Sequence, residues 1–156
     1  MTDIKVAYSA ETAVTITLAS NATGVVRAST EIDNTTNKYR NAKLQVKFKT
    51  GTGTTATSTL QFWISGSNDG VKYTDGATGA DGVVTLTVPP NATWVGRCNC
   101  PTASTSYNSD TFDLQKAWGG PLPPYFVIFV QNLSNSTLSS TAGDHAVTLV
   151  FLYDTV

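Results

Sequence analysis

The sequence predicts an all-β fold, a single-domain antiparallel β-sandwich over residues 1–156 with about eight or nine strands. Apolar residues recur mainly with a period of two, which is typical of strands, and no convincing amphipathic helix pattern is present. Thr and Ser are abundant, and the branched Cβ of Thr favours the pleated surface of a sheet over a helix. Charged residues make up 13% of the chain, about half the usual share, so Thr and Ser are expected to form the wet faces of the sheets.

The first half of the chain is expected to contain four strands after a polar N-terminal segment. In that segment, residues 1–11, the alternation of Ile4, Val6 and Tyr8 predicts either an arm that adds a strand to a partner or an ordinary edge strand. Strands follow at residues 13–18, 25–32, 42–50 and 58–65, of which 25–32 has the weakest pattern. The core-facing side chains of the other three are Val14, Ile16 and Leu18, then Leu44, Val46 and Phe48, then Leu60, Phe62 and Ile64.

The second half is expected to contain four or five further strands, about one every ten residues. Residues 125–131 are nearly all apolar, which predicts a central strand covered on both faces, and residues 146–153 form a similar terminal strand. Residues 110–115 form either a weak strand or a short helical turn through Ala117. Strands are also expected at 94–100 and at 83–88, where Val84, Leu86 and Val88 share one face.

Turn residues separate these strands. The segment 67–70 reads SNDG, which predicts a hairpin turn with positive φ that leads into residues 71–73. Residues 51–57 form a flexible Thr/Gly loop that could be a long hairpin tip, and residues 74–82 form a second loop. The GGPLPP segment at 119–124 ends one element and begins the apolar strand that follows.

The charge and the lengths of the apolar runs exclude two classes of partner, nucleic acids and membranes. Ten Lys and Arg residues are scattered along a chain of net charge −1, so we expect no nucleic-acid binding. No apolar run is long enough to span a bilayer, and the N-terminus has no signal-peptide pattern, so we expect no membrane association. Cys98 and Cys100 are expected to be ordinary reduced thiols on one strand face, as suits synthesis in a reducing cytoplasm.

Few residues suit catalysis or metal binding. His145 is the only histidine, and we interpret it as a polar residue at a strand end or a hydrogen-bonded neighbour of Asp144 rather than a catalytic base. Asp69, Asp75 and Asp81 lie in one stretch, 68–81, that could bind calcium, but they lack EF-hand spacing and read more simply as turn formers. We therefore assign no catalytic, metal or cofactor-binding residues and expect a protein that is not an enzyme.

Aromatic residues offer the strongest binding signal. Trp63, Trp94 and Trp118 could form a stacking surface for sugars, although core or interface packing is the commoner role of a strand Trp.

Two segments resemble a known group of proteins. Residues 62–76 read FWISGSNDGVKYTDG and residues 119–132 read GGPLPPYFVIFVQN; both are similar to segments of small tailed-bacteriophage structural proteins. Several of that group are jelly-roll capsid decoration (cement) proteins. The resemblance implies that the sandwich is jelly-roll-like. It also implies a virion structural protein, made in the bacterial host cytoplasm, that binds the major capsid protein and copies of itself as a homo-oligomer on the outer shell. A carbohydrate-binding module, or a tail, neck or fibre-associated virion protein, remains the alternative.

Overall fold

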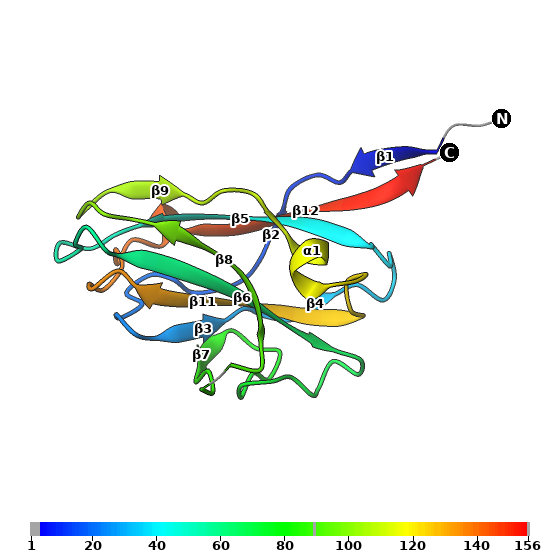
Figure 1. Ribbon diagram of the computed structural model, residues 1–156, viewed down its shortest axis with the longest axis horizontal. Helices are drawn as coiled ribbons and strands as arrows, with labels where there is room; N and C mark the ends of the chain where they lie inside the picture. Colours follow the sequence, from blue (N-terminus) through cyan, green and yellow to red (C-terminus); the bar gives the residue numbers. More distant parts are fainter. Residues whose placement is uncertain (1–3, 89, 156) are drawn as a thin grey trace.

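Two six-stranded antiparallel sheets pack against each other in the computed structural model, which describes residues 4–88 and 90–155 (Figure 1). The predicted all-β sandwich is therefore confirmed. Helix is confined to one short α-helix, α1 (Leu114–Trp118), and one turn of 3-10 helix, Ala142–Asp144, within the described ranges.

The first sheet has the order β1-β12-β5-β10, with β2 also paired to β12 and β9 also paired to β5. Its long central strands are β5 and β12, which pair over seven residues from Ala146↔Lys47 to Leu152↔Asn41. The strand bounds are β1 Lys5–Tyr8, β2 Thr12–Ala13, β5 Asn41–Lys49, β9 Ser106–Asn108, β10 Phe112–Asp113 and β12 Ala146–Thr155.

The second sheet has the order β7-β3-β11-β6-β8, with β4 also paired to β11. Its central pair is β6 and β11, which are hydrogen-bonded over nine residues from Tyr125↔Ser67 to Leu133↔Thr59. The strand bounds are β3 Val26–Ala28, β4 Ile32–Asp33, β6 Thr59–Ser67, β7 Gly82–Val84, β8 Thr93–Asn99 and β11 Tyr125–Leu133.

The strand order is that of a jelly roll. The segments β1 and β2, β3 and β4, and β9 and β10 each act as one interrupted strand, so the described residues contain eight main strands and the additional edge strand β7. Counted along the chain, the first main strand pairs with the eighth, the second with the seventh, the third with the sixth and the fourth with the fifth. This nested pairing divides the strands between two sheets as in the double Greek key of a jelly roll.

The main hydrophobic core lies between the two sheets, where the period-two alternation predicted it. Phe48 of β5 and Phe62 of β6 are fully buried there, and so are Phe126 and Ile128 of β11. Lys43, Gln45, Lys47 and Lys49 of β5 alternate with the buried residues and are half-buried or exposed, as expected for a strand with one wet face.

A second apolar cluster covers the outer face of the second sheet. Val127 and Phe129 of β11 are fully buried in it, although their side chains point away from the main core. The chain between β6 and β8 covers them with Ala77, Ala92 and the half-buried Tyr73. Coverage on both faces explains why β11 is apolar at successive positions, and this prediction is confirmed.

Three predicted strands differ in detail from the structure. Residues 14–18 bury Val14 and Leu18 as predicted but join no ladder, because the segment crosses from the first sheet to the second. The weak strand at 25–32 is divided into β3 and β4 at Ser29, whose hydroxyl accepts the N–H of Ile128 at 3.0 Å. The segment 110–115, for which the sequence allowed a strand or a helical turn, contains both: the two-residue strand β10 is followed directly by α1.

Two predictions for residues 67–88 are wrong, the hairpin at SNDG and the shared face of Val84, Leu86 and Val88. Gly70 has the expected positive φ of 70°, but residues 71–73 form no strand, because Asp69 Oδ1 accepts the N–H groups of Val71 and Lys72. Val88 does not face the same way as Val84 and is 98% exposed, because β7 ends at Val84 and the chain then turns.

The loop at 51–57 is not a hairpin tip either. It connects β5 of the first sheet to β6 of the second, so the two strands it joins do not pair.

Candidate functional site

A two-stranded ribbon projects from one end of the sandwich. It is formed by β1 and the end of β12, which pair from Lys5↔Thr155 to Tyr8↔Leu152. The ladder between β12 and β5 ends at Leu152, so β1 is the only strand that pairs with residues 153–155 in the part of the chain described. Figure 1 shows this ribbon extending beyond the body of both sheets.

One face of the ribbon exposes apolar side chains. Ile4, Val6 and Tyr8 alternate on that face and are 74%, 60% and 63% exposed. Exposed apolar residues scattered singly are ordinary, but three in a row on a projecting element are typical of an interaction surface. The sequence left open whether residues 1–11 form an arm for a partner or an edge strand. Residues 1–3 lie outside the described residues, and Lys5–Tyr8 form a projecting edge strand of the first sheet, paired with β12.

The opposite face of the ribbon is anchored to the body. Tyr39 stacks on Phe151 with ring centroids 4.6 Å apart and lies 5.9 Å from the ring of Tyr153. Phe151 belongs to the main core, so the base of the ribbon is continuous with the packed interior. The projection is therefore a supported extension of β12 rather than a loose tail.

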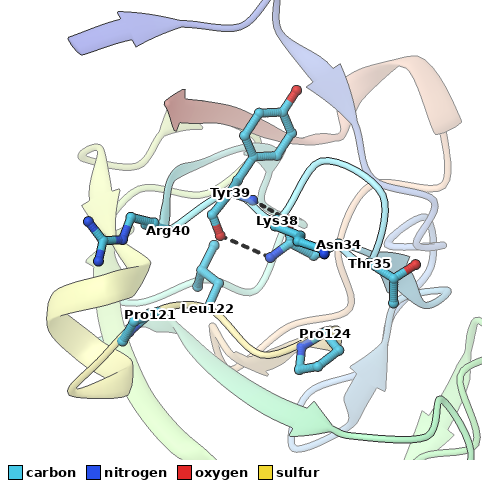
Figure 2. A pocket seen from close by; sticks show the side chains of 8 residues that line it. All are labelled: Asn34, Thr35, Lys38, Tyr39, Arg40, Pro121, Leu122 and Pro124. Atoms are coloured by element: carbon cyan, nitrogen blue, oxygen red, sulfur yellow. Dashed lines mark hydrogen bonds between the residues drawn. The ribbon is translucent and has the colours of Figure 1, made fainter. Parts of the chain in front are cut away.

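A hollow of about 480 Å³ lies beside Tyr39, between residues 34–40 and residues 121–124 (Figure 2). Buried Asn34 shapes it, because its side chain accepts the N–H of Tyr39 at 2.8 Å and donates to the Tyr39 carbonyl at 2.9 Å. Leu122 contributes an apolar wall, and the exposed cations Lys38 and Arg40 line the same hollow. A hollow with this lining could hold a partner's apolar side chain against Leu122 and an adjacent acidic side chain near Lys38 and Arg40.

The three Trp residues do not form one platform. Trp63 lies on the outer face of the second sheet and meets Trp94 edge to face, with centroids 4.8 Å apart and an interplanar angle of 78°. Trp118 instead packs against the main core, on the opposite face of that sheet, beside Gly66 and Pro123. Trp94 is the most open of the three to a ligand, with 41% of its surface exposed, whereas Trp63 and Trp118 are half-buried.

The three Asp residues of 68–81 are held by different partners. Asp69 caps its own turn, and hydrogen bonds from the Lys72 and Val71 backbone hold the pKa of its carboxyl far below the ordinary value. Burial raises the pKa of Asp81, but bonds from Thr17 and Arg27 outweigh it and lower the net value; Arg27 Nη2 lies 2.9 Å from Oδ1. No cluster of three or more His, Cys, Asp or Glu side chains that could hold a metal ion occurs among residues 4–88 and 90–155.

The sole histidine lies just before β12. Its Nε2 is 2.9 Å from the carbonyl oxygen of Ser139, so its partner is Ser139 rather than Asp144. The hydroxyl of Ser139 donates to Asp144 at 2.6 Å and is thus directed away from the His145 ring. These two hydrogen bonds hold the loop before β12 in place. They do not place the Ser139 hydroxyl on the His145 ring, as activation of a serine nucleophile by histidine requires.

The two cysteines are free thiols at the end of β8. Burial raises the pKa of both, and that of Cys100 reaches about 11, so the thiols stay protonated at neutral pH. The prediction of two unbridged thiols is confirmed.

No protein-family model matches the chain, and a search of the curated protein sequences finds no significant match.

None of the helices in the described ranges is long and apolar enough to cross a membrane.

Proposed function

We propose that this chain is a virion structural protein of a tailed bacteriophage, without enzymatic activity, that binds the outside of the capsid and stabilises it. The observation that carries the proposal is the projecting ribbon with its exposed apolar face on a jelly-roll body. A decoration protein needs a rigid body and an element that reaches a neighbour, and the ribbon supplies that element. The resemblance of residues 62–76 and 119–132 to small phage structural proteins supports the same assignment.

The surface composition also suits crowded assembly. Only 13% of the residues are charged, and the net charge is −1. Contacts made by Thr, Ser and Asn depend little on salt, unlike contacts between charged residues. On a shell, many copies make modest contacts together, so that total affinity exceeds the affinity of any one contact.

Capsids with and without the protein provide the test. We expect decorated shells to withstand heating that ruptures bare shells, and a label on the protein to lie over the shell, with the major capsid protein as its contact. Equal rupture temperatures together with a label confined to tail, neck or fibres would reject the capsid role and leave the alternative virion location.

Glycan binding is the second candidate, because Trp94 is exposed at the edge of the Trp63–Trp94 pair. If this pair is a sugar platform, Trp94→Ala abolishes binding on a glycan array, whereas Tyr153→Ala, which truncates another exposed aromatic side chain elsewhere, does not. A wild-type chain that binds no glycan at high concentration eliminates this candidate.

A further inference from the structure

We propose that the free edge of β1 pairs antiparallel with the same edge of a second copy of this chain, with Val6 opposite Val6. The pairing joins the first sheets of two copies into one continuous sheet through their ribbons. It rests on the proposed function only in assuming that the chain acts as a homo-oligomer, and purified protein tests it without any shell.

The backbone of β1 has an unused hydrogen-bonding edge. β1 is the last strand of its sheet and pairs on one side only, with β12, among the residues described. Just beyond the ladder, the Ser9 N–H donates to the Phe151 carbonyl at 2.9 Å, so Ser9 and Phe151 continue its register as a position where the two strands are hydrogen-bonded. Since such pairs alternate along antiparallel strands, Ala7 and Lys5 also face β12, and the N–H and C=O groups of Val6 and Tyr8 point outward.

The outward-facing residues are also the exposed apolar ones. When Val6 lies opposite Val6 of the second copy, Ile4 lies opposite Tyr8 and the outward hydrogen-bonding groups face each other across the two-fold axis. A shift of one residue would break this match, because inward-facing groups would then oppose outward-facing ones. The resulting row of six apolar side chains lies on one face, formed by Ile4, Val6 and Tyr8 of both copies.

The charge on β1 does not oppose this pairing. Lys5 is its only charged residue, and its side chain lies on the other face, where it meets Ala7 of the second copy instead of another lysine. Native edge strands usually carry charges, bulges or very short lengths that prevent pairing. The edge of β8 has a bulge opposite Phe62 and Trp63, and β7 and β9 are three residues long. β1 pairs over four residues without a bulge and carries its one charge, Lys5, on the face opposite the apolar row.

Geometry favours a second copy over an unrelated partner. The ribbon extends beyond the sandwich, so a two-fold axis at Val6 brings two ribbons together while the bodies remain apart (Figure 1). The same four-residue strand supplies both halves of the contact, which is the defining property of a two-fold interface. The contact is far smaller than the roughly 800 Å² per partner of a standard interface, so we expect a weak dimer that high local concentration strengthens.

Cysteine crosslinking tests the register. In the proposed pair the two Val6 Cα atoms lie about 5.5 Å apart, within the range that a disulfide spans, so the full-length Val6→Cys variant should form a crosslinked dimer under mild oxidation. Ala7→Cys is the matched control, because its side chain lies on the other face and opposite Lys5. Cys98 and Cys100 are present in both variants, and the wild-type chain reports any crosslinking through them. Equal crosslinking of the two variants, or none with Val6→Cys at high concentration, would overturn the proposal.

A charge substitution tests the same edge without covalent trapping. The wild-type chain should show a concentration-dependent dimer by sedimentation. Val6→Lys should abolish it, while Val83→Lys on β7, where the valine is similarly exposed at 65%, should leave it intact. Loss of the dimer in both variants, or in neither, argues against β1. If Val6→Cys crosslinks but the protein does not bind shells, the capsid role is rejected and the pairing stands. If the protein binds shells but Val6→Cys does not crosslink, the pairing is rejected and the capsid role stands.

Discussion

Asp75→Ala is expected to lower the free energy of unfolding by about 2–4 kcal/mol, because it removes a buried carboxylate that accepts hydrogen bonds from Thr87 and Ala92. Asp75 is 7% exposed. Its Oδ1 accepts the N–H of Thr87 at 2.8 Å and the hydroxyl of Thr87 at 2.7 Å, and its Oδ2 accepts the N–H of Ala92 at 2.8 Å. These bonds hold the chain between β6 and β8 over the outer face of the second sheet. Without the carboxylate the buried Ala92 N–H loses its partner.

The loss should depend on pH in a defined direction. Burial raises the pKa of Asp75, but the bonds from Thr87 and Ala92 outweigh it, so the net pKa in the folded state lies below the ordinary value. A carboxyl with a lowered folded pKa stabilises the protein above its unfolded pKa of about 3.9, and this stabilisation is lost as the pH falls through the folded value. The difference between wild type and Asp75→Ala should thus be constant above about pH 5 and shrink in more acidic solution.

Urea denaturation at pH 7 and at a series of acidic pH values measures both effects. Asp110→Ala is the matched control, because Asp110 is exposed and its carboxylate accepts the N–H of the adjacent Thr111, with no other bond to it among the described residues. A difference between wild type and Asp75→Ala that grows on acidification would contradict the assigned role of the carboxylate.

Local periodicity predicted the faces of strands but not their partners. The alternation in β5 and β6 and the uniformly apolar run in β11 identify core positions because side-chain direction depends only on neighbouring residues. Asp75, by contrast, is separated by 12 and 17 residues from the groups it binds. Its sequence context, TDG, is that of a turn, and nothing local distinguishes a turn Asp from one that closes a long loop.

At the candidate site, too, the sequence predicted the strand pattern but not the long-range contacts. The alternation of Ile4, Val6 and Tyr8 predicted a strand, but its partner lies about 150 residues away at the end of β12, and no local pattern encodes that pairing. The hollow beside Tyr39 was not predicted, because residues 34–40 and 121–124 meet only after the sheets form. The one local feature is that Asn34 is an Asn, a residue type whose side chain often binds nearby backbone, as it does to Tyr39 five residues later.

Phe129→Ala is expected to have the largest effect, a loss of about 3–5 kcal/mol in the free energy of unfolding. Phe129 is fully buried, yet it faces away from the main core and packs in the outer cluster with Val127 of β11 and Val26 and Ala28 of β3. Removing its ring leaves a cavity under the chain between β6 and β8. Val88→Ala in that same connection is the control, since Val88 is 98% exposed and should change stability little.

The double variant Asp75→Ala/Phe129→Ala should lose less stability than the two single losses added together. Asp75 holds the covering chain in place, and Phe129 is the surface on which that chain rests through Ala77 and Ala92. Once the carboxylate is gone and the cover is loosened, the ring has fewer contacts left to lose, so the two losses are coupled. Strict additivity in a double-mutant cycle would mean that the cover packs on the sheet independently of Asp75. Coupling would establish that one buried carboxylate maintains the second hydrophobic cluster, and with it the apolar character of both faces of β11.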